Sequence, residues 1–332
     1  MKKWALIFAG TLIFAGTLIF AGTLFYLNTS STPTTMKVEF LNRATGTVEQ
    51  EAIFGEGALR WVYETHLGKV ALWALIRRAC FSNFYGKMMS KPDSRERIEP
   101  FVEKYKIDTA EFAEPVESFA SFNDFFSRKL KPSARPIVDG NANACLPADG
   151  RHLAFENIGV ATQIYAKGQR FDLATFLGSA TLAKRYENGS LVCSRLCPTD
   201  YHRFHLPVAG TLDKINLING ELYSVNPIAL SQKLSYLWEN KRVVVEIDSQ
   251  EFGKVTQVIV GATNVGTICF SAKAGQTLEK GAELGYFRFG GSFVATFFEK
   301  DKIKLCKDLT DATARGLETY AKMGEALGKA EN

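Results

Sequence analysis

The sequence predicts an α+β fold, with N-terminal membrane-associated helices followed by a β-rich domain. Three observations indicate this: residues 1–27 are apolar and almost uncharged, residues 57–91 are rich in helix formers, and short apolar stretches separated by turn residues follow residue 140. The expected organisation is a membrane anchor at 1–27, a Ser/Thr/Pro linker at 28–36, a helical membrane-proximal region at 37–139 and the β-rich domain at 140–332.

The N-terminal run is long enough to cross a bilayer. From Trp4 to Leu27 it carries no charge, and as a helix it would be about 36 Å long. A hexamer, FAGTLI, repeats from Phe8 and leaves no face of such a helix polar. Lys2 and Lys3 favour an N-terminus on the inside. A cleaved signal peptide, or an extension upstream of a start at Met36, are the alternatives.

Residues 57–91 are expected to form basic, amphipathic helices at a membrane surface. They contain Trp61 and Trp73, and they carry several basic residues but only one acidic residue, Glu64. Aromatic and basic side chains together suit an interface that carries anionic lipid. Ordinary helices packed on a protein core are the alternative.

Strand patterns dominate after residue 140. In residues 214–225, Asn219-Gly220 separates two apolar stretches, which predicts a hairpin with a type I′ turn. The tail at 309–329 is predicted to form a polar terminal helix. Further strands are expected at 242–247, 254–270 and 280–298.

Composition narrows the class of protein. With 332 residues, 46% of them hydrophobic, the chain can bury a sizeable core. A net charge of +5 that is not gathered on one polar face does not suggest a nucleic-acid partner. The six cysteines form no C-x-x-C pair, so we expect free, mostly buried thiols, which favours a reducing compartment.

Two of the four histidines, His202 and His205, lie in CPTDYHRFHLPVAG (197–210). An H-x-x-H pair can ligate a metal, but no second cluster of ligands is evident, so no metal is expected. A hydrogen-bonded pair in the core is another reading. A general acid or base is the third, because imidazole titrates near neutral pH.

Asp149 and Ser292 are the other candidates for chemistry. Asp149 belongs to the turn sequence PADG (147–150), and beside His205 it would orient the imidazole. Ser292 follows two glycines in FRFGGSFVATFF (287–298). Glycines leave the preceding carbonyl sterically open, so the serine could attack it, given strain and a base. The absence of a G-x-S-x-G elbow disfavours an α/β-hydrolase.

Together and in this order, seven blocks resemble the phosphatidylserine decarboxylase family of self-processing pyruvoyl enzymes. The resemblance runs from about residue 37 to 325, and FLNRATGTVEQE (40–51) resembles the chlamydial-type branch in particular. The blocks are SFNDFFSRKLKPSARPI (121–137), PADG (147–150), YHRFHLPVAG (201–210), LYSVNP (222–227), NKRVVVEI (240–247), VGATNVGTI (260–268) and KGAELGYFRFGGS (280–292).

The resemblance implies that the β-rich domain is catalytic and that the chain cuts itself between Gly291 and Ser292. Ser292 would be the nucleophile and His205 the base, while Asp149 would orient His205. His202 would assist the later decarboxylation. Ser292 would end as an N-terminal pyruvoyl group, the covalent cofactor. The two chains would stay together as a heterodimer, with a higher oligomer left open.

The implied reaction converts phosphatidylserine into phosphatidylethanolamine and CO₂, so the lipid and the bilayer are the expected partners. The expected location is the cell (inner) membrane, anchored or peripheral, on a side that the sequence leaves open. Four basic residues would hold lipid phosphate or face the anionic surface, with a solvated loop as the alternative: Arg128, Lys129, Lys131 and Arg135.

One position departs from the family's pattern. Phe293 stands where a threonine usually follows the cleaved serine. The lost hydroxyl could position the scissile bond or the substrate. This departure supports a second hypothesis, a non-catalytic, membrane-anchored lipid-binding or interaction protein on the same fold. A serine hydrolase that uses Asp149, His205 and Ser292 is a poorer third, because it lacks an elbow.

Overall fold

The computed structural model describes residues 37–159, 171–263, 268–290 and 292–331. The chain divides into two compact units; the described part of the first is residues 55–75, and the second holds residues 37–54 and those described from 76 onward. The expected anchor and linker, residues 1–36, lie outside the described residues. Within those ranges, no helix has both the length and the apolar character needed to cross a membrane.

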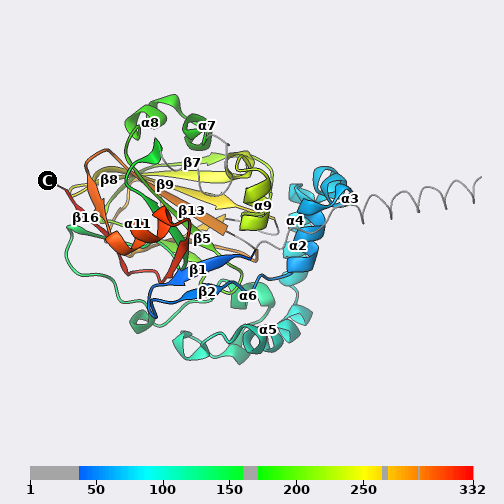
Figure 1. Cartoon of the computed structure of the whole chain (residues 1–332). Helices are drawn as coiled ribbons and strands as arrows, with labels where there is room; N and C mark the ends of the chain where they lie inside the picture. Colours follow the sequence, from blue (N-terminus) through cyan, green and yellow to red (C-terminus); the bar gives the residue numbers. More distant parts are fainter. Residues whose placement is uncertain (1–36, 160–170, 264–267, 291, 332) are drawn as a thin grey trace, which may run out of the picture. The chain divides into compact units, whose positions relative to one another are not determined.

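A ten-stranded sheet forms the centre of the larger unit (Figure 1). Its order is β11-β7-β8-β9-β13-β5-β4-β15-β1-β2, and all neighbours are antiparallel except β1 and β15. Strands β4, β5 and β13 are buried along their whole length, as expected where both faces are covered. In sheet order the strands are Thr277–Leu278, Gly210–Ile218, Arg242–Ser249, Gly253–Gly261, Ser292–Phe298, Ser190–Leu196, Gly150–Phe155, Glu318–Ala321, Glu39–Asn42 and Val48–Gln50.

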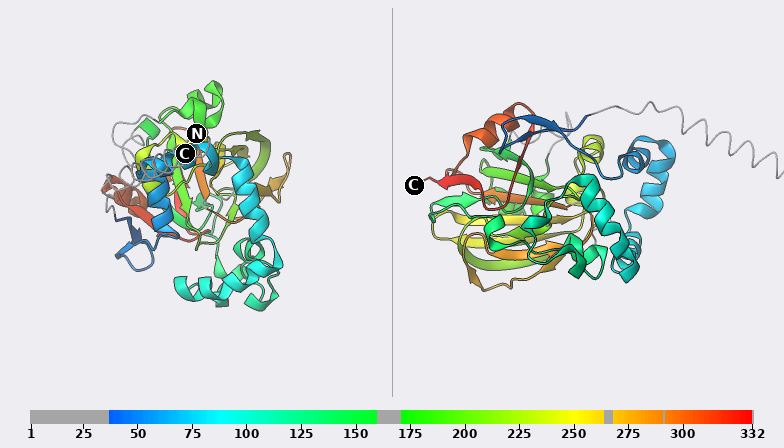
Figure 2. Two further views of the ribbon diagram at one scale, coloured as in Figure 1. Left: turned by 90° about the vertical axis from the view of Figure 1, so that its right-hand side faces the viewer. Right: turned by 90° about the horizontal axis from the view of Figure 1, so that it is seen from below.

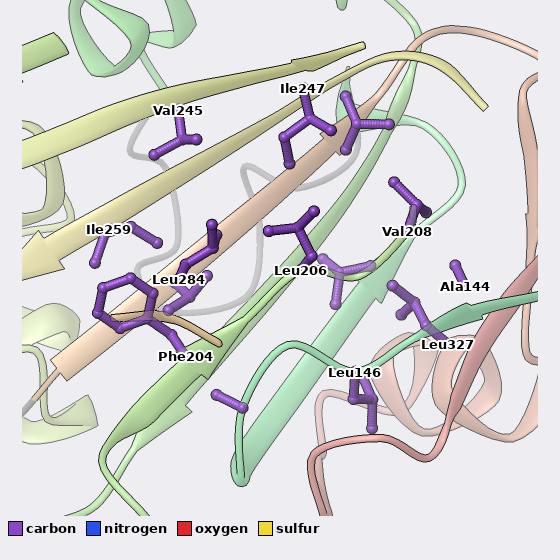
Figure 3. Close-up of a cluster of buried hydrophobic side chains, with 14 of the residues drawn as sticks. Ala144, Leu146, Phe204, Leu206, Val208, Val245, Ile247, Ile259, Leu284 and Leu327 are labelled. Atoms are coloured by element: carbon purple, nitrogen blue, oxygen red, sulfur yellow. The ribbon is translucent and has the colours of Figure 1, made fainter. Parts of the chain in front are cut away.

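Two three-stranded sheets, β10-β12-β6 and β14-β16-β3, share a hydrophobic core with one face of the large sheet. In this core, Val245 and Ile259 of the large sheet belong to the same cluster as Phe204 and Leu284 of the sheet β10-β12-β6 (Figure 3). The added strands are Ile268–Phe270 (β10), Glu283–Phe287 (β12), Arg203–His205 (β6), Ile303–Leu305 (β14), Ala326–Ala330 (β16) and Asn143–Cys145 (β3).

Short helices share a second core with the opposite face. Phe293 and Phe297 of β13 belong to the same buried cluster as Phe176 and Leu230 from the helices. Successive side chains of a strand point to opposite faces, so β13 contributes to both cores. The helices are Leu173–Leu177 (α7), Ala180–Arg185 (α8), Pro227–Gln232 (α9) and Tyr236–Glu239 (α10).

An aromatic cluster lies among the helices between residues 79 and 134 of the larger unit. Phe101, Phe122 and Phe125 make edge-to-face contacts, and Phe289 joins them from the segment before β13. These helices are Ala79–Met89 (α4), Pro92–Arg97 (η2), Ile98–Tyr105 (α5), Thr109–Glu111 (η3), Val116–Ser118 (η4), Phe122–Phe126 (α6) and Pro132–Ala134 (η5). The smaller unit holds Glu56–Glu64 (α2) and His66–Ala71 (α3), and a π-helical turn, Leu72–Ile76 (η1), follows.

The structure agrees with the predicted helices at 57–91 and with the predicted strands near 242–247, 254–270 and 280–298. Two other predicted elements were wrong. Residues 214–225 form no hairpin, because β7 pairs with β8 instead. The tail is not one helix: α11 (Lys307–Ala314) is followed by strands β15 and β16. In both cases pairing with a distant strand outweighs the local pattern.

Strands β1 and β2 lie at the opposite end of the chain from β15, yet they extend the sheet beside it (Figure 2). They fall within residues 37–139, where helices were expected. The sequence offers no turn signal that would reveal a parallel partner almost 280 residues away, since Phe40 pairs with Glu318.

Lowering the pH should begin to destabilise this fold at pH values well above the pKa of a carboxylate. Burial lowers the pKa of His152 and of His202 to about 3, whereas an unfolded histidine titrates near 6.5. As the pH falls below that unfolded value, only the unfolded chain binds protons, so stability is lost progressively down to the folded value. We expect each histidine to cost about 2 kcal/mol between pH 7 and pH 5, measured as the urea midpoint.

His152→Gln is the matched variant for this measurement. A glutamine amide can replace the contacts of the imidazole with Ser194 Oγ and the Ala321 carbonyl. The variant should lose one histidine's share of the pH dependence between pH 7 and pH 5, about 2 kcal/mol, because His202 and His205 remain buried. An unchanged slope would contradict the proposal that neutral His152 contributes to acid sensitivity.

Candidate functional site

Ser292 is the first residue of β13 and pairs with the last residues of its two neighbours, Leu196 of β5 and Gly261 of β9. Strand β4 begins at the same end with Gly150, where an added Cβ would lie 2.5 Å from the Arg195 carbonyl oxygen. Only glycine fits so close an approach. Asp149, just before Gly150, therefore lies at the same end of the sheet as Ser292, two strands or about 10 Å away.

The hydroxyl of Ser292 is fully buried, and among the described residues Oγ has no hydrogen-bond partner. Burying a hydroxyl without a partner costs about 1–3 kcal/mol. Thr296 and Thr319 also bury a hydroxyl without a described partner, so what distinguishes Ser292 is its place as the first residue of β13, directly after two glycines.

The chain before the expected cleavage bond is held in place at Phe287 and Phe289. Phe287 N donates to the His202 carbonyl (2.9 Å), and Phe289 N donates to Asn123 Oδ1 (2.7 Å). The Phe289 ring is buried between aromatic rings of the helices. Gly290 has φ of 142°, which favours glycine. Gly291 lies outside the described residues, between this fixed segment and β13.

His202 lies next to this segment. Its ring contacts that of Phe126, with centroids 3.9 Å apart, and its Nδ1 lies 2.9 Å from the Asp200 carbonyl. A carbonyl only accepts, so Nδ1 carries the proton and Nε2 has a free lone pair. Nε2 is buried without a hydrogen-bond partner in the described ranges, although the backbone of Gly290 is near enough to raise the pKa slightly against the larger effect of burial.

His205 faces the other way, since residues three apart in extended chain point to opposite sides. Its Nδ1 donates to the Gly281 carbonyl (2.9 Å), which leaves Nε2 to accept from the Tyr201 hydroxyl (3.3 Å). Burial lowers the pKa of His205, while Gly281, Glu283 and Asp149 oppose this shift. His205 is therefore a neutral base with its lone pair on Nε2.

The carboxylate of Asp149 binds Arg135 rather than an imidazole. Arg135 donates to both of its oxygens, at 2.8 Å and 2.5 Å, and Met323 N donates to Oδ1 (2.8 Å). No hydrogen bond joins Asp149 to His205 within the described chain. Tyr201 contacts His205 through its hydroxyl, and its ring lies 5.9 Å from the guanidinium of Arg135, the partner of Asp149.

The four basic residues grouped in the sequence occupy different environments. Arg135 is committed to Asp149 and to Glu111, and these partners raise its pKa despite burial. Lys129 and Lys131 are exposed, and Lys131 Nζ donates to the Ala110 carbonyl. Arg128 is 5% exposed and lies against the rings of Phe112 and Phe125. Only Arg128 and Arg135 therefore lie inside the protein.

Phe293 points away from Ser292, into the core that β13 shares with the helices, and is fully buried. Its neighbours in the sheet register are Arg195 and Val260. The departure from threonine thus falls on the apolar side of the strand.

Several contributors were not predicted from the sequence. Tyr201 precedes His202 in the motif but carried no signal of its own, and Asn123 and Phe289 position the segment through contacts between distant residues. In the described chain, no three potential metal ligands gather into one group.

Comparison with known proteins adds sequence relationships to this geometry. A family model described as phosphatidylserine decarboxylase matches residues 122–329. The phosphatidylserine decarboxylase proenzyme of Fusobacterium nucleatum is 43% identical over 89% of this chain and 99% of its own. Those of Chlamydia trachomatis serovar L2 and Desulfitobacterium hafniense are 43% and 39% identical, over 87% and 88% of this chain and 96% and 98% of theirs.

Among solved structures, one titled "crystal structure of cbpa from L. salivarius REN" matches 31% of this chain and 53% of its own, at 18% identity and a TM-score of 0.19. This similarity is too low to indicate a shared fold.

Proposed function

The chain belongs to the phosphatidylserine decarboxylase family, as its sequence blocks predicted, and from this premise we propose that it cuts itself between Gly291 and Ser292. The protein is a carboxy-lyase, made as a proenzyme, whose pyruvoyl group derives from a serine of the chain. It converts phosphatidylserine into phosphatidylethanolamine and CO₂. The observation that carries the assignment of Ser292 is its buried hydroxyl without a described partner, directly after an anchored segment.

The first step is an N-to-O acyl shift. His205 removes the hydroxyl proton of Ser292, and Oγ attacks the carbonyl carbon of Gly291. The bond from this carbon to the Ser292 nitrogen breaks, the nitrogen takes the proton, and an ester replaces the amide. His205 is supported in this role by its neutral ring with a lone pair on Nε2. Asp149 makes no hydrogen bond to His205 in the described chain and binds Arg135 instead.

The second step is a β-elimination. A base removes the α-proton of Ser292, the bond from Cβ to Oγ breaks, and Gly291 leaves as a carboxylate. The resulting dehydroalanine tautomerises to an imine, and water releases ammonia to leave a ketone. The products are residues 1–291 and 292–332. Strand β13 pairs over its whole length with β5 and β9, which favours continued association of the two chains.

When formed, the pyruvoyl group supplies an electron sink for the pair left by departing CO₂. The residues that would hold it are the start of β13 and His202. The free Nε2 of His202 can accept a hydrogen bond from the head-group amine, because burial keeps the imidazole neutral. The rings of Phe126 and Phe287 beside His202 limit the access of water.

Substitutions of His205 and His202 should affect different steps of the reaction. His205→Ala should leave a single uncut chain of unchanged length. His202→Ala should still be cut, but release of CO₂ from carboxyl-labelled phosphatidylserine should fall by at least about 100-fold. Intact-mass measurement of the purified chains and the CO₂ assay read the two steps independently.

His66→Ala is the matched control, since His66 is exposed in the smaller unit. It should be cut and active. The reverse result, a cut His205→Ala and an uncut His202→Ala, would assign the base to His202. A parent protein that keeps one mass with unmodified Ser292 would contradict self-cleavage at this bond.

The family is membrane-associated, and the contact is proposed to use the N-terminal anchor together with residues 57–91 at the inner membrane. In the smaller unit Trp61, Val70 and Trp73 are exposed, and in α4 Phe84 is 64% exposed. Exposed aromatic side chains close to basic residues suit an interface with lipid.

A further inference from the structure

A pocket of about 280 Å³, open to solvent and lined mostly by polar side chains, lies in the larger unit at the same end of the sheet as Ser292. Its walls include Arg128, Arg135, Asp149 and Tyr201. The volume is close to the lower end of small-molecule sites, about 300 Å³. It therefore suits a polar head group rather than acyl chains.

Most charges around this pocket are already paired. Arg135 binds Asp149 and Glu111, and Arg151 binds Asp200 at 2.6 Å. Lys322 binds Glu111, and Lys106 and Asp108 are exposed. The charges of these groups are therefore balanced by a partner or by solvent, without a bound ion.

Arg128 is different. Its side chain is 5% exposed, and no described carboxylate lies within 4 Å of it. Nε has no described hydrogen-bond partner, and the two terminal nitrogens reach only backbone carbonyls, of Phe125 and Asp200, at 3.5 Å each. Burial lowers its pKa to about 10, so it remains a cation at neutral pH. The faces of Phe112 and Phe125 offset part of the cost of burying this cation, but no anion pairs with it, so a ligand that supplies one would stabilise it further.

Arg128 also lies next to the reacting end of the site. The Asp200 carbonyl accepts from both Arg128 and His202, and His202 in turn neighbours Gly290. A ligand on Arg128 and a group at Ser292 would thus flank one imidazole. In the substrate, the phosphate lies only a few bonds from the amine.

We propose that Arg128 binds the phosphodiester of the lipid head group in this pocket. The proposal rests on the proposed function and names the substrate contact of the same site. A guanidinium presents donors that match phosphate oxygens. The head-group carboxylate is excluded as its ligand on energetic grounds: a cation there would stabilise the charge that must leave as CO₂, and so would favour the ground state. The phosphate keeps its charge throughout.

Binding of head-group fragments to the purified, processed full chain tests the proposal. Calorimetry would compare glycerophosphoethanolamine, ethanolamine and inorganic phosphate. Arg128→Met should weaken the binding of glycerophosphoethanolamine by at least about tenfold, or 1.4 kcal/mol. It should leave the affinity for ethanolamine unchanged. The affinity of Arg128→Lys for glycerophosphoethanolamine should lie between those of the parent and Arg128→Met, because lysine keeps the charge but not the planar set of donors. Lys300→Met, at an exposed lysine beyond the far end of β13, should match the parent.

Kinetics with short-chain phosphatidylserine below its micelle concentration give a second readout. Arg128→Met should raise KM by at least about tenfold and change kcat by less than about threefold, as loss of uniform binding does. Complete self-cleavage and an unchanged melting temperature would show that the variant folds. If Arg128→Met does not fold, Arg128→Lys carries the same comparison.

Equal affinity of the parent and Arg128→Met for glycerophosphoethanolamine would overturn this inference alone. So would inorganic phosphate that binds the parent as tightly as glycerophosphoethanolamine, since the site would then hold free phosphate. An uncut parent that releases no CO₂ would instead contradict the proposed function. The same calorimetric comparison, made between the uncut parent and the uncut variant, would still report on Arg128.

Discussion

Ser292→Ala should give one uncut chain and lower CO₂ release by at least about a thousandfold, because it removes the only proposed nucleophile and the source of the pyruvoyl group. The fold should persist, since Oγ makes no hydrogen bond to a described residue. We even expect a small gain in stability, as a buried hydroxyl without a partner is replaced by a methyl group. Intact mass, the CO₂ assay and the urea midpoint measure the three effects.

Thr296→Ala is a close control. Thr296 lies on the same face of β13, is fully buried, and its Oγ1 also lacks a hydrogen-bond partner among the described residues. It should be cut and active, with a similar change in stability. Two chains from Ser292→Ala would show that the cut lies elsewhere.

Arg195→Met should be the most destabilising single change in the sheet, at about 3–5 kcal/mol. Arg195 is 1% exposed and forms ion pairs with Glu51 and Glu318. Burial would raise the pKa of Glu51, yet Arg195 lowers it to about 2, so the carboxylate is charged at neutral pH. Without the arginine, Glu51 would keep its contact with Arg151, and the buried carboxylate of Glu318 would lose its ion pair with Arg195. Urea unfolding at pH 7 gives the measurement.

Arg185→Met is the matched control, because Arg185 is 29% exposed and pairs with Glu246. It should cost less than about 1 kcal/mol. Adding Glu51→Gln and Glu318→Gln to Arg195→Met should recover part of the loss, since no uncompensated charge then remains. A loss below about 1 kcal/mol for Arg195→Met would contradict the assignment of this cluster as a structural centre.

The cluster also links distant parts of the chain to the site. Glu51 follows β2, Glu318 begins β15, and Arg195 is the register partner of Phe293. The same arginine therefore fixes the N-terminal strands against the strand that carries Ser292. Phe293 packs on the buried face next to this cluster, where a threonine would fill less of the core.

The sequence by itself determined the family, the reaction and the candidate residues, because Asp149, His202, His205 and Ser292 stand in short contiguous motifs. It also located strands β8, β9, β12 and β13, since apolar stretches and turn residues are local signals. It was wrong for the hairpin at 214–225 and for the terminal helix, where distant partners prevail.

Only the tertiary structure decided how these motifs meet. It attached Asp149 to Arg135, set Tyr201 beside His205, and turned His202 toward Gly290. It also divided four neighbouring basic residues into two surface lysines, one paired arginine and one buried arginine without a described carboxylate. Burial and partnership depend on segments far apart in the chain, so no local pattern encodes them. Those two quantities set the charge and reactivity of a side chain.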